Sequence, residues 1–178
     1  MADVTLQQRA LRIALTQVGV REVPINSNRG PEVEKYLQCV GMQPGNAWCA
    51  AFTSWCIWQA GGKAPVTHPH TAWTPAIWEW GKKHGMAFSA EDVQEKLVDA
   101  GDWSGALFLI HGNVGNEPMP RVKHVGFVEK LEDGYVHTVE GNTDASGSRE
   151  GGGVYQNRRA LPSIYGFVTY GDYLLTSV

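Results

Sequence analysis

The most informative stretch of this sequence covers residues 46–56 and reads Asn46-Ala47-Trp48-Cys49-Ala50-Ala51-Phe52-Thr53-Ser54-Trp55-Cys56. A polar loop containing a glycine precedes it, its apolar character continues to residue 60, and a pair of glycines follows. This length and composition predict a buried helix that ends at the glycine pair, because glycine often occupies the position after a helix C-terminus. The rest of the fold is expected to pack around this helix.

Cys49 lies in the first turn of this expected helix. There the unpaired backbone N–H groups and the positive end of the helix dipole favour a thiolate over a thiol. The same N–H groups can stabilise an oxyanion beside the sulfur. A cysteine in an apolar segment is, taken alone, more often a packing residue. Cys49 is therefore a candidate nucleophile only if a general base reaches it from elsewhere in the chain.

Length and composition indicate one globular domain covering residues 1–178, with 43% hydrophobic and 19% charged residues. The formal net charge is −3 and no run of Lys and Arg is longer than two, so we expect neither nucleic acid nor a membrane surface as a partner. No apolar run approaches the length of a membrane span. We expect a monomer.

The first residues lack the basic start and apolar core of a signal peptide, so synthesis in the cytoplasm without a classical leader is expected. Three cysteines make an odd count and do not indicate a disulfide framework. Cys56 lies two helical turns beyond Cys49, roughly 10 Å away, which is too far for a disulfide. Cys56 and Cys39 are therefore interpreted as inert packing residues.

Helical patterns occupy the first half of the chain and strand patterns the second. Helices are expected over residues 6–18, 31–40, 49–60, 74–80 and 89–98, and strands over 106–110, 122–131, 135–140, 154–159 and 164–170. Without alternation of strand and helix, this order predicts an α+β fold in which N-terminal helices pack on a C-terminal antiparallel sheet.

A nucleophilic cysteine needs a histidine to take its proton and a third group to orient that histidine. Among the six histidines, His124 begins an expected strand whose hairpin partner carries Glu140 and Asn142 close together. If residues 133–134 formed a simple two-residue turn, Glu140 and Asn142 would point away from His124, because side chains alternate along a strand. A three-residue loop over residues 132–134 instead places Asn142 opposite His124, with Glu140 on the same face. We therefore favour the three-residue loop.

Several other residues have two interpretations. Trp48 and Trp73 could form the wall of a groove for a sugar or peptide, although tryptophans are mostly core residues. The pair Arg158-Arg159 could bind a carboxylate of a peptide, but an exposed strand end is the simpler interpretation. The His68-Pro69-His70 segment could suggest metal ligation, but no Cys, Asp or Glu cluster accompanies it, so a solvated loop is expected.

The segments 48–52, 105–110, 124–128 and 140–143 resemble, in order and spacing, the CHAP family of cysteine, histidine-dependent amidohydrolases/peptidases. The resemblance extends from about residue 9 to residue 170. It implies a papain-like fold and cleavage of amide bonds in bacterial peptidoglycan, as an N-acetylmuramoyl-L-alanine amidase or an endopeptidase.

Carried onto this sequence, the resemblance implies Cys49 as nucleophile, His124 as general base, Glu140 as its orienting carboxylate and Asn142 as a supporting polar partner. Many members have a glutamine before the cysteine, whereas this chain has Trp48, which leaves the side-chain donor of the oxyanion hole unassigned apart from Asn46 as a weak candidate. Some members also have an aspartate-rich calcium loop before the cysteine, which is missing here. We therefore expect no metal and no cofactor.

The sequence thus predicts a cysteine hydrolase acting on peptidoglycan, either as a phage lysin (endolysin) or as an exported antibacterial toxin. An immunity protein or a phage or secretion component would be a natural partner. Two other functions remain open: a papain-like deamidase or transamidase toxin acting on a protein, and a non-catalytic wall-binding module.

Overall fold

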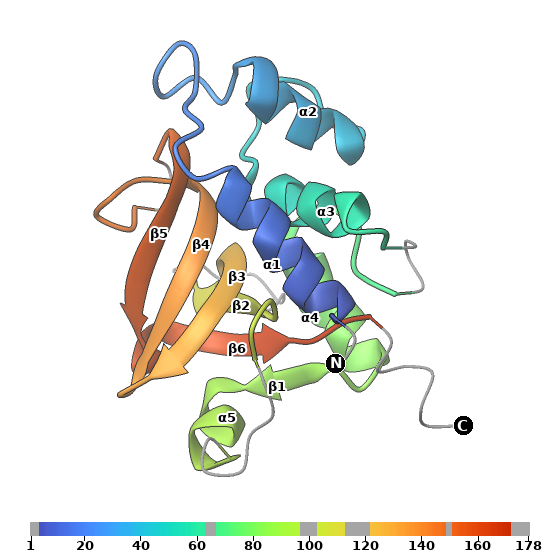
Figure 1. The fold of residues 1–178 in the computed structure, drawn as a ribbon, viewed down its shortest axis with the longest axis vertical. Helices are drawn as coiled ribbons and strands as arrows, with labels where there is room; N and C mark the ends of the chain where they lie inside the picture. The colour runs from blue at the N-terminus through green and yellow to red at the C-terminus, as the bar shows by residue number, and fades with distance from the viewer. Residues whose placement is uncertain (1–3, 63–66, 97–102, 113–121, 149–150, 172–178) are drawn as a thin grey trace.

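The computed structural model of the chain describes residues 4–62, 67–96, 103–112, 122–148 and 151–171 (Figure 1). Its helices are α1 (Leu6–Thr16), α2 (Pro31–Cys39), α3 (Cys49–Gln59), α4 (Thr74–Lys83) and α5 (Ala90–Lys96), and a 3-10 turn, η1, covers Leu161–Ser163. The strands are β1 (Ala87–Ser89), β2 (Leu107–His111), β3 (Val122–Glu132), β4 (Tyr135–Thr143), β5 (Gly153–Ala160) and β6 (Ile164–Val168).

The strands form one antiparallel sheet in the order β1-β6-β2-β3-β4-β5. Helices α1, α2 and α3 lie together on one side of this curved sheet (Figure 1). Helix α5 packs against β1 and β6, and its Val93 lies in a second core cluster with Phe108 and Phe167. The expected α+β fold, with N-terminal helices packed on an antiparallel sheet, is confirmed. The expected end of the last helix, at residue 98, lies outside the described residues.

The first helix shows how local sequence sets an element. The Gln8 backbone N–H donates to Thr5 Oγ1 (3.2 Å), and the Thr5 backbone N–H donates to Gln8 Oε1 (3.1 Å). This reciprocal capping box satisfies two N–H groups that the helix leaves unpaired. Leu6, Ala10 and Ala14 then lie along the buried side of α1. The expected start of this helix is confirmed.

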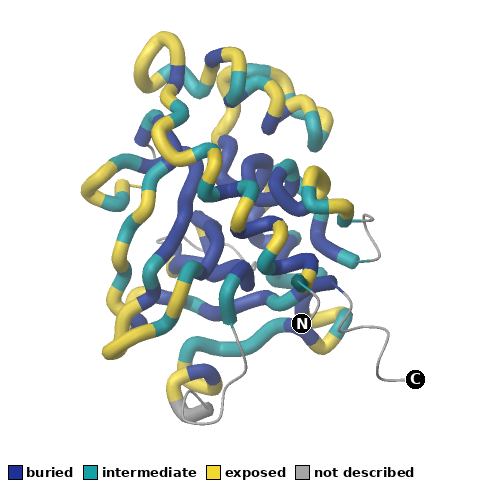
Figure 2. The backbone as a smooth tube through the Cα atoms, in the orientation of Figure 1, coloured by how far each residue is buried: buried dark blue, intermediate teal, exposed yellow. Residues whose placement is uncertain are grey.

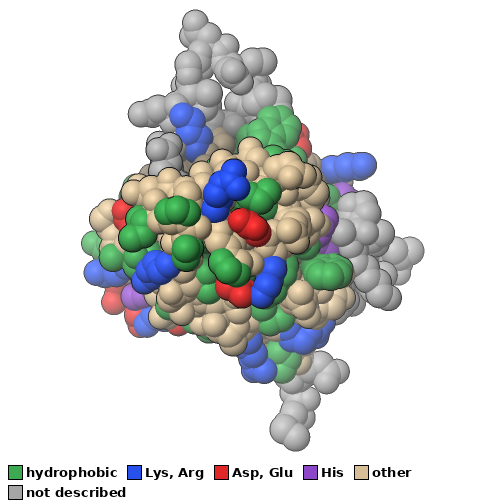
Figure 3. Space-filling view, turned by 90° about the horizontal axis from the view of Figure 1, so that it is seen from above, with side chains coloured by type: hydrophobic (Ala, Val, Ile, Leu, Met, Phe, Trp, Pro, Cys, Tyr) green, Lys and Arg blue, Asp and Glu red, His purple; other side chains and the backbone are tan. Residues whose placement is uncertain are grey.

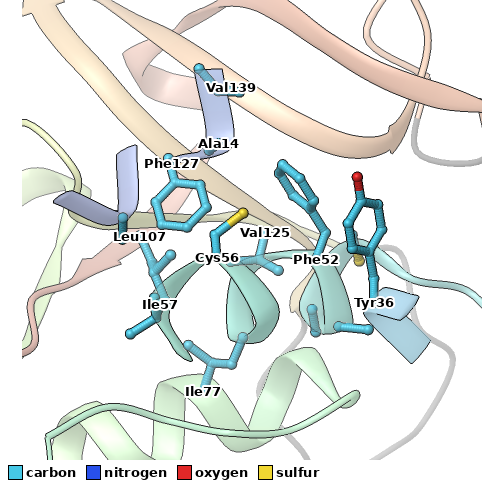
Figure 4. Packing of buried hydrophobic residues seen from close by; sticks show 14 of the residues in the cluster. Ala14, Tyr36, Phe52, Cys56, Ile57, Ile77, Leu107, Val125, Phe127 and Val139 are labelled. Atoms are coloured by element: carbon cyan, nitrogen blue, oxygen red, sulfur yellow. The ribbon is translucent and has the colours of Figure 1, made fainter. Parts of the chain in front are cut away.

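The main core lies between α3 and the sheet. Figure 4 shows Cys56 pointing among Phe52, Val125 and Phe127, and all four residues are fully buried. Figure 2 shows the corresponding stretch of buried backbone through the centre of the molecule. Ile77 brings α4 against the other side of α3 (Figure 4). With packing on both sides, α3 is buried over most of its length, as its continuous apolar sequence predicts.

Two details differ from the sequence-based expectation. Helix α4 continues past Gly81 to residue 83, because Gly81 serves packing: a Cβ there would lie 3.0 Å from both Val168 methyl groups. The expected end of this helix at residue 80 is therefore wrong. The strand β1 was not expected. It is three residues long and, among the described strands, pairs with β6 alone at the edge of the sheet, so its sequence carries little signal.

The β3–β4 hairpin has a two-residue turn, so the expected three-residue loop is wrong. Glu132 pairs with Tyr135, and both turn residues, Asp133 and Gly134, have positive φ angles, as a type I′ turn requires. A β-bulge at Glu129 then shifts the register by one residue. Beyond the bulge the pairing is the one that the longer loop would have produced. His124 and Glu140 therefore do share a face of the sheet, through the bulge.

Among the described residues, no helix is both long enough and apolar enough to cross a membrane. Seen from above, lysine and arginine side chains are scattered between acidic, apolar and neutral ones rather than gathered into one patch (Figure 3). This face has no concentrated positive charge of the kind that a polyanion would bind.

Gly141 offers a test of how tightly β4 packs on α3. An alanine Cβ at this position would lie 2.7 Å from Trp48 Cζ3 and 2.8 Å from Phe52 Cγ, and both rings are fully buried. We expect Gly141→Ala to lower the free energy of unfolding by about 1–3 kcal/mol in urea denaturation, because the rings have no space to move into. Gly152→Ala is the control with more room, its nearest contact being Glu22 Oε2 at 3.3 Å. Equal stability of the Gly141 variant and wild type would contradict the packing described here.

Candidate active site

Cys49 is the first residue of α3, with Trp48 as the N-cap. The backbone N–H groups of the first helical turn have no partner within the helix, so they are available to a group that binds beside the sulfur. Helix α3 packs against β3, which carries His124. The expected position of Cys49, at the beginning of a buried helix, is confirmed.

His124 and Glu140 form a buried pair on neighbouring strands. His124 Nε2 lies 2.8 Å from Glu140 Oε2, and both side chains have no solvent exposure. Because Nε2 is occupied by the carboxylate, Nδ1 is the ring nitrogen that is left for Cys49. No other hydrogen bond occupies Nδ1 within the described part of the chain. The structure thus brings Cys49, His124 and Glu140 together, with His124 between the other two, as the sequence analysis expected.

Electrostatics separate Cys49 from the other two cysteines. Burial alone would raise the pKa of the Cys49 thiol, but the neighbouring His124 imidazole, together with hydrogen bonds from the Thr74 side chain and the Val125 backbone, holds this pKa below its usual value. Burial instead raises the pKa of both Cys39 and Cys56. Among the three thiols, Cys49 is therefore the one that favours the thiolate.

The surroundings of His124 favour its protonated form. Burial acts to lower the pKa of His124, but Cys49 and Glu140 outweigh it and raise this pKa to about 9. Burial acts to raise the pKa of Glu140, but His124 and Arg159 lower it to about 2. These pKa shifts favour a thiolate on Cys49 beside an imidazolium on His124, which in turn bonds to the Glu140 carboxylate.

Arg159 is a member of this cluster that the sequence analysis did not identify. Its Nε donates to Glu140 Oε1 (2.7 Å), and its Nη2 donates to Glu140 Oε2. The Thr138 hydroxyl also donates to Glu140 Oε1 (2.5 Å). The β4–β5 pairing explains the contact: Val136 faces Arg159, and Val136, Thr138 and Glu140 alternate onto one face of the sheet. Arg159 is thus not an exposed strand end.

Asn142 supports the start of α3 through a contact with Trp48. Its Oδ1 accepts a hydrogen bond from the Trp48 backbone N–H (2.9 Å), and its Nδ2 donates to Asn28 Oδ1 (3.1 Å) and to the Gly151 carbonyl (3.2 Å). Asn142 has a φ of 58°, an uncommon conformation that asparagine tolerates better than most residues. The side chain therefore fixes the residue immediately before Cys49.

Trp48 does not form the wall of a groove, contrary to one interpretation of the sequence. Its ring is fully buried against Tyr36 and Phe52, and its indole N–H donates to the buried carboxylate of Glu22 (2.8 Å). Burial in the core removes more apolar area of this ring from water than a position at the edge of an open groove would. Trp48 acts as an anchor for the start of α3.

Trp73 and Asn46 lie in loops. Trp73 is 54% exposed and directly precedes Thr74, whose hydroxyl lies beside the Cys49 sulfur, so its ring is accessible near the site. Asn46 is exposed, and its Nδ2 donates to the Gln43 carbonyl of its own loop (2.8 Å). The structure therefore leaves Trp73 as a candidate for ligand contact and turns the Asn46 amide back onto its own loop.

The segment with two histidines is not a solvated loop. His68 is fully buried, and its ring lies edge-on to that of His70, which reaches the Cys39 carbonyl through Nε2 (2.8 Å). Burial, followed by the nearby His70, lowers the pKa of His68 to about 4. The described residues contain no cluster of three or more His, Cys, Asp and Glu side chains suited to a metal ion.

The CHAP domain model matches residues 41–142, which is more than half of the chain and includes Cys49, His124, Glu140 and Asn142. This chain belongs to the CHAP domain family. The family comprises cysteine, histidine-dependent amidohydrolases and peptidases, so the match supports a hydrolase of this general type. Arg159 lies outside the matched residues of the CHAP domain.

No curated protein sequence matches the chain. Among solved structures, the crystal structure of Ly7917 is similar at 18% identity and a TM-score of 0.49, covering 94% of this chain and 62% of that one. The crystal structure of Ly7917 with the hydrolyzing product of MDP is similar at 17% identity and a TM-score of 0.46, covering 93% and 63%. The present chain therefore spans less than two thirds of either structure.

The contacts of Arg159 predict that it stabilises this CHAP domain. Removal of its charge would leave the Glu140 carboxylate buried with His124 and Thr138 as its remaining partners. We expect Arg159→Gln to lower the free energy of unfolding by about 2–3 kcal/mol, near the lower end of the cost of breaking a buried ion pair, because His124 still compensates part of the charge. Chemical denaturation at pH 7 measures this effect.

Arg158 provides the matched control. It is the adjacent arginine, it is exposed, and its guanidinium stacks over the Tyr135 ring at 3.5 Å from the ring centroid. We expect Arg158→Gln to change stability by less than about 1 kcal/mol, as is usual for exposed cation–π contacts. Equal losses in the two variants would mean that charge at this end of β5, rather than the Glu140 contact, is what stabilises the fold.

Proposed function

We propose that this chain is a cysteine-dependent peptidoglycan hydrolase that cleaves an amide bond in the cell-wall peptide, as an N-acetylmuramoyl-L-alanine amidase or an endopeptidase. The observation that carries the proposal is the buried pair of His124 and Glu140 beside Cys49 at a helix start, in a chain of the CHAP domain family. A phage lysin and an exported antibacterial toxin both fit this chemistry.

In the proposed mechanism the Cys49 proton resides on His124 before the substrate arrives. The thiolate attacks the amide carbonyl carbon, forming a C–S bond while the carbonyl oxygen takes up the electron pair and becomes an oxyanion. The free N–H groups at the start of α3 are the donors available to that oxyanion. Asn142 keeps them in place by holding the preceding Trp48 N–H.

Collapse of the tetrahedral intermediate expels the amine. The His124 imidazolium gives its proton to the leaving nitrogen as the C–N bond breaks, which leaves a thioester on Cys49 and a neutral imidazole. That imidazole then takes a proton from a water molecule that attacks the thioester, and the acid product leaves as the thiolate returns. Glu140 keeps the ring oriented throughout and stabilises its positive charge.

The substrate would approach the exposed side of the sulfur, where Trp73 is the accessible aromatic side chain. Aromatic rings pack well against sugar and peptide groups. A polar hollow of about 580 Å³ over β4 and β5, lined in part by His137, Arg158 and Arg159, does not include Cys49 or His124. We therefore place the cell-wall substrate on the Trp73 side. We also propose that the enzyme acts as a monomer on the cell wall after release or export, with an immunity protein or a phage or secretion component as a partner.

The pKa values predict a bell-shaped dependence of the rate on pH. The rate should rise through the lowered pKa of Cys49 and fall above about pH 9, where His124 loses the proton that the leaving amine requires. Initial rates of release of soluble fragments from peptidoglycan, measured between pH 4 and 10.5, would show this profile. A rate that kept rising beyond pH 9.5, as an ordinary thiol would give, would contradict the thiolate–imidazolium pair.

Purified peptidoglycan sacculi test the proposed function directly. We expect wild type to release soluble fragments, and Cys49→Ala to release at least about 10³-fold less, because the variant lacks the sulfur that forms the acyl-enzyme. Mass spectrometry of the fragment termini would distinguish an amidase from an endopeptidase. Cys56→Ala is the matched control, since Cys56 is a buried packing residue of the same helix.

The remaining outcomes discriminate between the alternatives. Equal release by wild type and Cys49→Ala would exclude Cys49 as the nucleophile. No release by either protein, with Cys49 still reactive toward a thiol reagent, would favour a deamidase or transamidase acting on a protein. No release together with an unreactive Cys49 would favour a non-catalytic wall-binding module.

A further inference from the structure

Thr74 lies beside the Cys49 sulfur, and the sequence analysis gave it no role. Its Oγ1 is 3.9 Å from Cys49 Sγ, within hydrogen-bonding distance for sulfur. The residue is buried, and within the described part of the chain the sulfur is the hydrogen-bonding partner of its side-chain hydroxyl. A buried hydroxyl generally requires such a partner.

The position of Thr74 is fixed from two directions. It is the first residue of α4, and Ile77, one turn further along the same face, is fully buried in the main core against α3 (Figure 4). The loop before it is joined to α3 by a reciprocal pair of hydrogen bonds: Ser54 Oγ donates to the Thr71 carbonyl (3.0 Å), and the Thr71 N–H donates to Ser54 Oγ (3.1 Å). The hydroxyl is therefore held at the sulfur by packing that does not depend on Cys49 itself.

The chemistry of the two groups determines which one donates. A hydroxyl can donate or accept, but a thiolate can only accept. With the Cys49 proton on His124, the Thr74 hydroxyl must be the donor. A hydrogen bond to a charged acceptor is stronger than one between neutral groups, particularly in a buried site.

We propose that Thr74 is a further catalytic residue, which donates a hydrogen bond from Oγ1 to the Cys49 thiolate and holds the sulfur in position for attack. The inference rests on the proposed function only in taking Cys49 as the nucleophile; it does not depend on which amide is cleaved. When the thioester forms, the sulfur loses its charge and this hydrogen bond weakens, so it stabilises the free enzyme and the returning thiolate.

The test compares Thr74→Val, which removes the hydroxyl at nearly constant shape, with Thr74→Ser, which retains it. The measurement is the rate at which iodoacetamide alkylates Cys49 as a function of pH, followed by mass spectrometry of the peptide that contains Cys49. We expect Thr74→Val to shift the inflection upward by about half a pH unit to one unit and to reduce alkylation below the inflection about threefold to tenfold, the effect of losing one hydrogen bond to a charged group. We expect Thr74→Ser to stay within about twofold of wild type.

Superimposable profiles for wild type and Thr74→Val would overturn the proposal, as would a shift in Thr74→Ser as large as that in Thr74→Val. Thermal unfolding of each variant checks the fold, and Thr74→Ala replaces Thr74→Val if the valine variant does not fold. Because alkylation requires no substrate, the two proposals fail separately. If alkylation of Cys49 in wild type showed the alkaline inflection of an ordinary thiol, the proposed nucleophile would be wrong. If wild type were inactive on sacculi but Thr74→Val still shifted the alkylation profile, only the proposed substrate would be wrong.

Discussion

The burial of the Glu140 carboxylate is the constraint on which the site depends. A carboxylate without solvent exposure is very unfavourable unless its oxygens are satisfied by donors and its charge is compensated. Here the donors come from three neighbouring strands: His124 on β3, Thr138 on β4 itself and Arg159 on β5. The three strands must therefore keep their register for the charge to remain buried. The interaction that orients the histidine is also one that fixes the sheet.

Strand β4 positions both halves of the proposed reaction centre. Glu140 reaches across to His124, and two residues later Asn142 holds the N–H of Trp48, which immediately precedes the nucleophile. Between them, Gly141 lets the strand approach the buried rings on α3 more closely than any side chain would permit. Strand β4 thus contacts both His124 and the start of α3, through Glu140 and Asn142.

The sequence allowed the helices and most strands to be predicted because these elements have local signals: caps, apolar periodicity and turn residues. The grouping of Cys49 with His124 and Glu140 came instead from the hairpin register and from the resemblance to the CHAP family. The pairing of β3 with β4 near His124 was inferred correctly, but from a three-residue loop that the structure does not have. The β-bulge at Glu129 has no residue that distinguishes it in the sequence, and only the pairing of two distant strands reveals it. Gly81 likewise looked like a helix end, because its packing partner, Val168, lies on β6, which is distant in the sequence.

Arg159 and Thr74 were missed for a related reason, since each acts on the site only through the tertiary fold. Arg159 looked like one of two exposed arginines, and the side that it faces follows from the β4–β5 register. Thr74 looked like an ordinary helix start, and its contact with Cys49 depends on how α4 packs against α3. No pattern within a single segment separates these residues from their neighbours.

The types of these two residues follow from the order of charges in the site. In the proposed resting state, the Cys49 thiolate, the His124 imidazolium, the Glu140 carboxylate and the Arg159 guanidinium alternate in sign and sum to zero, so each charge has a neighbour of opposite sign. A cation in place of Thr74 would also stabilise the thiolate, but it would lower the pKa of His124 and remove the proton that the leaving amine needs. A neutral hydroxyl stabilises the Cys49 thiolate without lowering the pKa of His124. An uncharged donor therefore suits the position beside Cys49, and a charged arginine suits the position beside the Glu140 carboxylate.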